Sequence, residues 1–477
     1  MKNIYALRKV LITVVIFIIG TYQFSAQVGI GTTNPNVTSM LDIQSTEKGV
    51  LIPRMTKAQR DAIVTPAPGL QIYNTTDNTS DIYSGGIWKS LAFNKSSNLV
   101  YVYSLADLPT PAGTAITLDL TKMYIFSGFV DISPNYIVIN GAGLRGTDPQ
   151  KDTVASNVSG AVLRSTNTNI FIQDLAVAPL SGGTKAYDFS DSTKTKYCNS
   201  FSGSSVLEIA GPSLGVGQIS GFKAITFTKN YWKVSDGIKI TGNVGKFTSA
   251  FCFVEGIATG RSGIEFLAGL NVDDIDLSNN YFVYTGNTGV KVIAGAVVDR
   301  GRMTTNMFRG VTTPLDGINS YSSGWSMKQN TDIPDSRAFS FIFFTNNPIA
   351  NITTFPAVGT YVKIVGPTTM INQKRFTATD NRITYNNVEP IVGKISVVIG
   401  AKAPATGSDF SIAIAKNGTV ISPFASMASA VNNQFFQIIL NTEVDFVNND
   451  YIEVFIRSNN ATATTIVVDE LQFRVTD

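Results

Sequence analysis

The 477-residue chain has a formal net charge of +3, and only 15% of its residues are charged. This small and dispersed charge argues against nucleic acid as a partner. The chain contains no histidine, which excludes Ser-His-Asp and Cys-His catalysis and histidine-based zinc sites.

Residues 1–26 have the features of a signal peptide. A short cationic segment precedes the uninterrupted apolar run Val10–Gly20, which has eleven residues. Because this run is too short for a comfortable membrane span, we expect cleavage near Ala26/Gln27, although an uncleaved anchor is the alternative. The chain is predicted to be exported, either extracellular or associated with the outer membrane, and a periplasmic location stays open. No later apolar run predicts a transmembrane segment after signal cleavage.

Two cysteines, Cys198 and Cys252, remain in the exported part. In an oxidising compartment they would form one disulfide. The alternative is that both are small residues buried in a β-core.

Residues 27–95 form a compact N-terminal module. Thr56 and Gln59 fit a capping box that opens a helix running to about Val64. Gly69–Tyr73 and Asp81–Leu91 read as two strands around a polar turn. The module is too small to hold much of its own core, so we expect it to need a partner chain.

The motifs of this module resemble a known group. VGIGTTNPN, LDIQSTEKGVLIPRMTKAQRDAI and GGIWKSL, within Val28–Leu91, are similar to N-terminal modules of exported Bacteroidetes proteins and of phage tail-fibre-like proteins. The resemblance implies a surface or fibre setting and brings no catalytic residue.

Residues 96–131 read as transition strands, and residues 132–335 contain an internal repeat. Gly237, Gly263 and Gly289 each begin a Gly-apolar-charged-apolar pattern, at intervals of 26 residues, and Gly317 continues the series. Asn230, Asn280 and Asn306, each followed closely by aromatic residues, form a second series. Such a period indicates a solenoid.

The repeat predicts a right-handed parallel β-helix, because each unit holds short strands. Ile238/Ile240 and their equivalents would face inward, with charged residues such as Lys239 outward. The asparagines are expected at turns, where Asn tolerates a left-handed backbone. An ordinary β-sandwich with accidental spacing is the alternative. The predicted fold class is therefore all-β, with a small α+β module in front.

Residues 336–477 have a different sequence pattern, with longer predicted strands and turn signals such as Asn417-Gly418. They predict an antiparallel jelly-roll sandwich. The series ending in DYIEVFIRSNN and ELQFRV resembles the C-terminal domains of C1q/TNF-like and tail-fibre trimers. The resemblance implies a homotrimer whose C-terminal domain caps the solenoid.

Carboxylates in the solenoid are the candidates for catalysis. Alternation would place Asp274 and Asp276 on one face and Asp273 on the other, with Glu265 in a neighbouring repeat. Adjacent coils would bring two carboxylates within the range that glycosidases use. A polysaccharide lyase or hydrolase, as in a tail-spike depolymerase, is therefore the alternative function. Calcium binding by the aspartates is a weak option because their spacing does not match an EF-hand loop, and no other cofactor or metal is predicted.

The leading hypothesis is a non-enzymatic, trimeric surface or fibre protein, an adhesin that binds glycans or another cell surface. Candidate residues for stacking on sugar rings are Tyr281, Tyr284, Tyr321 and Trp325. The alternative is that most of them fill the solenoid interior or the join to the C-terminal domain.

Overall fold

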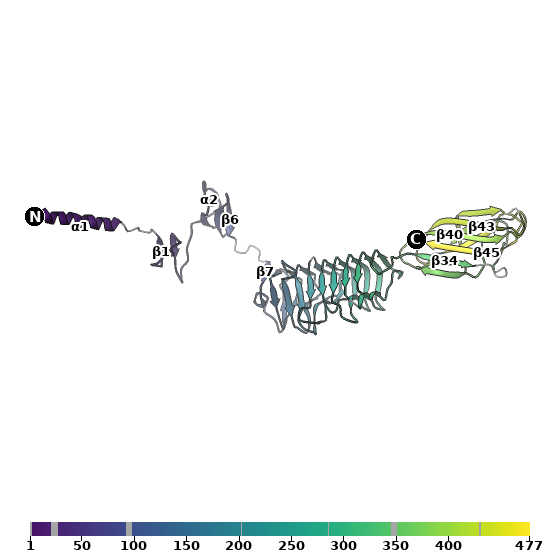
Figure 1. Ribbon diagram of the computed structural model, residues 1–477, viewed down its shortest axis with the longest axis horizontal. Coiled ribbons are helices and arrows are strands. Elements are labelled where there is room, and N and C mark those ends of the chain that lie inside the picture. Colours follow the sequence, from purple (N-terminus) through teal and green to yellow (C-terminus); the bar gives the residue numbers. More distant parts are fainter. Residues whose placement is uncertain are drawn as a thin grey trace. The chain divides into compact units, whose positions relative to one another are not determined.

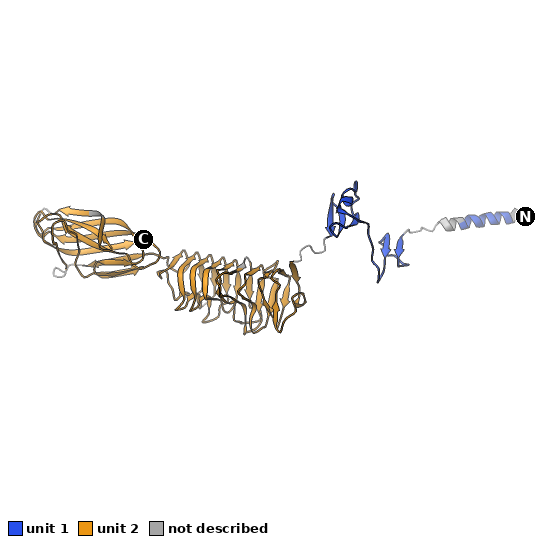
Figure 2. Cartoon of the chain, turned by 180° about the vertical axis from the view of Figure 1, so that it is seen from behind, with its two compact units in different colours: residues 1–96 blue, residues 97–477 orange. Residues whose placement is uncertain are grey.

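The computed structural model describes residues 2–20, 27–91, 98–201, 203–284, 286–344, 351–428 and 431–477 (Figure 1). The chain divides into two compact units, residues 1–96 and 97–477 (Figure 2). Helix α1 (Lys2–Gly20) covers the apolar run of the predicted signal peptide, whereas Ala26 lies outside the described residues. Among the described helices, none has the length and apolar character needed to cross a bilayer.

The first unit contains two small sheets. β1 (Val28–Ile30) and β2 (Leu41–Ile43) pair in parallel. The second sheet has the order β3 (Arg54–Met55), β4 (Gln71–Asn74), β5 (Thr79–Ser84) and β6 (Ile87–Leu91). Thr56 and Gln59 form the predicted capping box, but the helix, α2 (Lys57–Asp61), ends before Val64. The segment predicted as one strand, residues 81–91, is divided between β5 and β6, because Gly85 and Gly86 adopt positive φ and turn the chain.

The centre of this unit is polar. Arg60 pairs with the buried carboxylate of Asp81, and the Asn74 amide donates to the same carboxylate at 3.1 Å. Burial works against ionisation of Asp81, but hydrogen bonds from Thr79, Arg60 and other neighbours lower its pKa. Of the apolar residues described between positions 27 and 91, Ile72 is the one that is fully buried. Residues 27–91 of this unit therefore contain no apolar core of their own.

The second unit begins with a solenoid whose walls are three parallel sheets (Figure 1). The eight-stranded sheet consists of β10 (Phe129–Asp131), β13 (Thr153–Ser156), β16 (Ala176–Pro179), β19 (Ser205–Leu207), β22 (Tyr231–Lys233), β25 (Phe253–Glu255), β28 (Tyr281–Val283) and β31 (Met307–Arg309). The nine-stranded sheet consists of β8 (Ala115–Thr117), β11 (Tyr136–Val138), β14 (Gly160–Thr166), β17 (Thr184–Asp191), β20 (Gly217–Gly221), β23 (Ile238–Thr241), β26 (Ser262–Phe266), β29 (Thr288–Val292) and β32 (Thr313–Asp316). The ten-stranded sheet consists of β7 (Leu99–Val102), β9 (Met123–Phe126), β12 (Gly143–Arg145), β15 (Ile170–Gln173), β18 (Tyr197–Phe201), β21 (Ala224–Thr228), β24 (Asn243–Ala250), β27 (Asn271–Ser278), β30 (Val297–Thr304) and β33 (Trp325–Lys328). Each complete coil contributes one strand to each sheet, and the incomplete coils at the two ends account for the unequal strand numbers. The predicted parallel solenoid is therefore confirmed.

The solenoid begins earlier than predicted. Strands within residues 99–131 pair in parallel with the next coil, for example β7 with β9 and β8 with β11. The predicted transition segment is therefore the first coil. Its sequence lacks the glycine pattern of the later coils, so the repeat alone does not mark it.

The glycine repeat marks equivalent strands. Ile238 pairs with Ile264 and Ile264 with Val290, each 26 residues further along, and all three are fully buried. The next coil is shorter, because Val290 pairs with Leu315. Gly317 therefore follows its strand and is not the equivalent of Gly289, which corrects the predicted series.

Repeat glycines make room for interior aromatic rings. A Cβ on Gly289 would lie 2.5 Å from the Phe308 ring, and one on Gly263 would lie 3.0 Å from Phe282. Phe282 and Phe308 themselves stack at 4.9 Å with an interplanar angle of 2°. Glycine and phenylalanine are thus complementary parts of one interior column.

The repeated asparagines form a buried ladder. The Asn280 backbone N–H and side-chain amide both donate to Asn306 Oδ1, at 3.0 and 2.9 Å. Asn306 donates in the same way to Asn330 Oδ1. The left-handed residue is the one before each asparagine, such as Asn279 or Thr305, which corrects the expectation for the asparagines themselves.

Asn306→Leu is expected to lower the free energy of unfolding by about 2–4 kcal/mol, because it leaves buried polar groups of Asn280 and Leu277 without partners.

Cys252 occupies the equivalent turn position in another coil. It follows a left-handed residue, Phe251, and its N–H donates to Asn280 Oδ1 at 3.1 Å. Cys252→Asn is therefore the matched control and should change stability by less than about 1 kcal/mol. Chemical denaturation followed by circular dichroism measures both variants, and equal losses would contradict the ladder.

The two cysteines are buried free thiols. Cys198 pairs with Ile225, and Ile225 pairs with Phe247 of the strand that precedes Cys252. The cysteines therefore lie in coils that are two strand spacings apart, so they are separated by at least about 10 Å, which exceeds the Cα separation of a disulfide. The disulfide alternative does not fit this geometry, and the second alternative, two buried core residues, does.

The C-terminal part is an antiparallel sandwich of two sheets, as predicted. One sheet contains β37 (Thr369–Lys374), β34 (Phe339–Phe344), β45 (Thr465–Thr476), β40 (Ile391–Lys402) and β43 (Phe435–Phe446), with β35 (Ile352–Thr354) paired to β45. The other contains β38 (Phe376–Thr379), β39 (Arg382–Tyr385), β44 (Tyr451–Ser458), β41 (Asp409–Lys416) and β42 (Thr419–Ala428), with β36 (Val362–Lys363) paired to β44. Asn417 and Gly418, both with positive φ, form the tight turn between β41 and β42.

Candidate functional site

The predicted carboxylates Asp274 and Asp276 lie on the outer face of β27. Asp274 is flanked in register by Lys246 and Arg300 of the adjacent coils. Asp276 lies beside Arg302, whose guanidinium is 3.4 Å from its carboxylate. These two carboxylates share a face, but each has a cationic neighbour.

Asp273 also faces outward, which corrects the predicted alternation. Its carboxylate is exposed and lies 3.0 Å from the Lys194 ammonium. The strand pairing passes from Val272 to Asp274, so the chain bends at this point and two successive residues leave the interior. The prediction assumed that successive side chains of a strand alternate strictly between the two faces, and this alternation is interrupted at Asp273.

Glu265 is not brought to the aspartates. It lies on β26 of the nine-stranded sheet, between Lys239 and Lys291 in register. Asp274 and Asp276 belong to the ten-stranded sheet. Within the described ranges there is also no group of three or more carboxylate or cysteine side chains arranged to hold a metal ion, and the calcium option stays a prediction.

Two of the four predicted aromatic contacts are buried. Tyr284 is 7% exposed, and its hydroxyl donates to the Thr288 carbonyl at 2.8 Å, while burial raises its pKa. Trp325 is 2% exposed and covers Gly301, where a Cβ would lie 2.4 Å from the indole. Both fill the interior and are unavailable to a sugar. Tyr321 is half-buried with the Lys374 ammonium 4.3 Å above its ring.

Tyr281 is part of an outward aromatic row on the eight-stranded sheet. In register along the coils, Tyr231 lies beside Phe253 and Phe253 beside Tyr281, with ring centroids 5.6 and 5.2 Å apart. The second pair is stacked at an angle of 14°. We call these three residues the aromatic ladder. All three are half-exposed, and Met307 follows them in the next coil.

The aromatic ladder exists because these strands are three residues long. Only the middle residue of each strand points inward, as Trp232, Val254 and Phe282 do. Both flanking residues therefore point outward, and the second outward row contains Lys233 and Glu255.

Polar groups border the aromatic ladder. The Tyr231 hydroxyl donates to the Glu255 carboxylate, and the Lys233 ammonium lies 3.8 Å from the same carboxylate. Burial, together with the nearby Glu255 charge, raises the pKa of Tyr231 to about 12. Tyr231 therefore stays a neutral donor at physiological pH.

A cleft with a volume of 720 Å³ lies at the start of the aromatic ladder. Its lining residues include Pro149, Gln150, Ser205, Lys229, Tyr231 and Lys233. We call it the ladder cleft. It lies within the size range of small-molecule pockets.

The segment 146–152 forms one wall of the ladder cleft. It is inserted between β12 and β13 and is held by Asp152, whose carboxylate accepts hydrogen bonds from the backbone N–H groups of Gly128, Thr147 and Asp148. Burial works against the charge of Asp152, but these bonds outweigh it and lower its pKa. Ser205 Oγ donates to the Pro149 carbonyl at 2.9 Å, so the wall is fixed to the floor.

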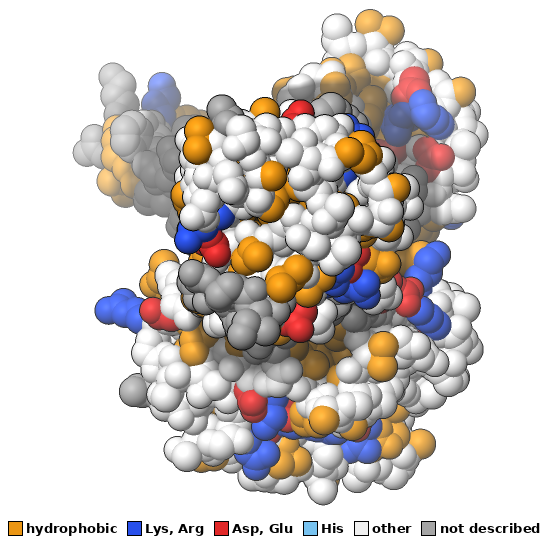
Figure 3. Space-filling model, turned by 90° about the vertical axis from the view of Figure 1, so that its right-hand side faces the viewer, with side chains coloured by type: hydrophobic (Ala, Val, Ile, Leu, Met, Phe, Trp, Pro, Cys, Tyr) orange, Lys and Arg blue, Asp and Glu red, His pale blue; other side chains and the backbone are white. Residues whose placement is uncertain are grey.

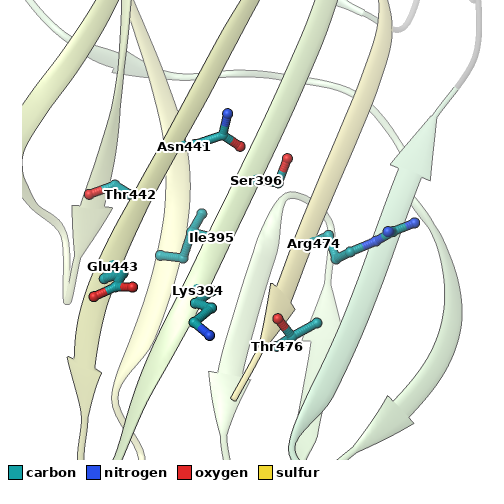
Figure 4. A pocket seen from close by; sticks show the side chains of 8 residues that line it. All are labelled: Lys394, Ile395, Ser396, Asn441, Thr442, Glu443, Arg474 and Thr476. Atoms are coloured by element: carbon teal, nitrogen blue, oxygen red, sulfur yellow. The ribbon is translucent and has the colours of Figure 1, made fainter.

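The C-terminal sandwich has a separate polar hollow of 420 Å³ on the sheet that contains β40, β43 and β45 (Figure 4). Lys394 and Glu443 are paired in register there, and Arg474 lies over the Phe341 ring. An outward row on the same sheet joins Phe343, through Gln472, to Val398 and Ile439. On the face seen in Figure 3, basic and acidic side chains lie in small mixed groups on a mostly uncharged surface.

Comparison with known proteins finds one matching family model. Residues 29–101 match the model described as phage tail like trimerisation region. No curated protein matches the chain. The match agrees with the predicted resemblance of the N-terminal module to tail-fibre-like proteins and adds trimerisation to it.

Solved structures that match the chain include a full-length tailspike protein 2 from the Escherichia coli O157:H7 bacteriophage CAB120. It is 9% identical, with a TM-score of 0.24, over 88% of this chain and 80% of that chain. Murine APRIL is 10% identical, with a TM-score of 0.21, over 29% of this chain and 99% of that chain. At these identities and TM-scores, neither likeness bears on what this chain binds.

Proposed function

We propose that the chain is an exported, homotrimeric fibre-like adhesin that binds a glycan on the aromatic ladder and in the ladder cleft, without cleaving it. The observation that carries the proposal is the row Tyr231, Phe253 and Tyr281 beside a cleft of 720 Å³. Half-exposed aromatic rings offer flat apolar faces to sugar rings, and the bordering Lys233 and Glu255 offer partners for hydroxyl groups.

Three features support a homotrimer. The trimerisation model covers residues 29–101, and the first unit exposes apolar residues around a polar centre. The outward row of Phe343, Val398 and Ile439 on the sandwich is a second apolar surface suited to a neighbouring subunit. Export itself is proposed from the apolar run Val10–Gly20 and the resemblance of Val28–Leu91 to modules of exported Bacteroidetes proteins.

The second candidate function is a polysaccharide lyase or hydrolase of the tail-spike type. It is favoured by one observation: Asp274 and Asp276 share the outer face of β27. Residues two apart on a strand are about 7 Å apart, which is within the separation of glycosidase carboxylates. We prefer binding because both carboxylates lie beside cations. A reducing-sugar assay decides: polysaccharide breakdown that is lost in Asp274→Asn would establish the enzyme.

Tyr281→Ala is expected to weaken glycan binding roughly three- to tenfold, because it removes one stacking surface of the aromatic ladder. A glycan array on the full chain selects the ligand, and calorimetry then measures the affinity. Tyr197→Ala, which removes a tyrosine that is 41% exposed on the ten-stranded sheet, is the matched control and should bind like the unaltered chain. If both variants bind equally well, the aromatic ladder is not the binding surface.

A further inference from the structure

A third pocket lies where the last coils of the solenoid meet the C-terminal sandwich. Its volume is 390 Å³, and its lining residues are Asp274, Arg300, Gly301, Arg302, Ser326, Arg375 and Glu389. We call it the arginine pocket. Three guanidinium groups and two carboxylates thus border one small space, and a third carboxylate, that of Asp276, lies 3.4 Å from Arg302.

Arg375 is the unusual residue of this pocket. It connects β37 and β38 with a φ of +58°, a left-handed conformation that costs free energy for a non-glycine residue. Its terminal nitrogen donates to the carbonyls of Ser320 and Trp325, so the side chain is fixed against the last coil. Its Nε–H group is buried and has no hydrogen-bond partner. A buried donor without a partner is rare, because its desolvation is not compensated.

Arg300 and Arg302 face the pocket from β30. They are exposed and lie two residues apart on one strand, so their guanidinium groups project to the same side. Arg302 is partly neutralised by Asp276, at 3.4 Å, whereas Arg300 is beside Asp274 in register. The pocket wall therefore presents guanidinium donors and carboxylate acceptors side by side, which suits a ligand that carries both a negative charge and hydroxyl groups.

We infer that the arginine pocket binds the carboxylate of a uronic-acid residue in an acidic glycan. A carboxylate matches the planar guanidinium fork and can form paired hydrogen bonds with it. Asp274, Glu389 and Ser326 supply acceptors for the hydroxyl groups of the same sugar ring. The two carboxylates of the pocket would repel a compact dianion such as sulfate or phosphate, so the geometry selects a monoanion that also carries hydroxyl donors.

This inference rests on the proposed function, because it names the class of glycan that the chain would bind. The arginine pocket and the aromatic ladder, however, lie on different sheets. Failure of one site therefore leaves the other measurable. Tyr281→Ala tests the ladder, and the arginine variants below test the pocket.

The test is calorimetry of the full chain with trigalacturonate, maltotriose and inorganic sulfate. Trigalacturonate should bind, and Arg300→Gln combined with Arg302→Gln should weaken it at least tenfold, the effect of losing a charge-assisted hydrogen bond. Arg375→Lys should also weaken it, because lysine keeps the charge but loses the planar guanidinium fork. Arg309→Gln, which removes an exposed arginine of the eight-stranded sheet, is the control and should leave the affinity unchanged.

Three outcomes would overturn the inference. They are no binding of trigalacturonate, unchanged affinity in the double arginine variant, and sulfate that binds as tightly as trigalacturonate. Loss of binding in Tyr281→Ala but not in the double variant would assign the acidic glycan to the aromatic ladder instead.

Discussion

Phe282→Ala is expected to lower the free energy of unfolding by about 3–5 kcal/mol, the range for removing a large buried aromatic side chain. Phe282 is fully buried and stacks on Phe308 at 4.9 Å, in the space that Gly263 leaves open. Each coil packs against the coil on either side of it. A cavity in one coil therefore weakens its packing against both neighbouring coils. Chemical denaturation of the full chain, followed by circular dichroism, measures the loss.

Tyr281→Ala is the matched control, because it removes an aromatic ring from the next residue of the same strand. Tyr281 points outward and is half-exposed, so its removal should cost no more than about 1 kcal/mol. Equal losses in the two variants would contradict the assignment of Phe282 to the interior and Tyr281 to the surface. A small loss for Tyr281→Ala also shows that its effect on glycan binding does not come from unfolding.

The solenoid could be predicted from the sequence because its coils repeat in register. Ile238, Ile264 and Val290 recur at a constant interval, and stacked coils place them above one another. The sandwich was predictable from local signals such as Asn417-Gly418, which forms a tight turn. Both signals are visible in the sequence itself, because one is a constant interval between adjacent coils and the other is a two-residue turn.

The candidate site was less predictable, because loops of variable length separate its residues. Tyr231, Phe253 and Tyr281 are separated by 22 and then 28 residues, so a search at a fixed period finds only part of the aromatic ladder. A usable signal was present: a three-residue strand whose middle residue is buried exposes both flanking residues, as in Tyr231-Trp232-Lys233. The wall at residues 146–152 and the arginine pocket depend on contacts between distant segments, which no local pattern contains.

The first unit has its polar and apolar residues in an inverted arrangement. Arg60, Asn74 and Asp81 are buried, whereas Val50 is 60% exposed and Leu51 is 85% exposed. Val50 and Leu51 also line a hollow of 310 Å³ with Ile52, Arg54, Tyr73 and Ser80. An apolar surface of this kind is stable in water when another chain covers it. The match of residues 29–101 to a trimerisation region supports a copy of the same chain in that role.

Leu51→Asp combined with Val50→Asp is therefore expected to convert the trimer into monomers. Each buried aliphatic side chain contributes about 1.5–3 kcal/mol, and threefold symmetry multiplies the loss across three subunits, with six new carboxylates added at the interface. Sedimentation velocity on the chain from residue 27 onward measures the mass at micromolar concentration. Thr46→Asp, at an exposed polar position in the same segment, adds charge without removing apolar surface and should stay trimeric. A monomeric unaltered chain, or a trimer that survives both aspartates, would show that the first unit does not hold the subunits together.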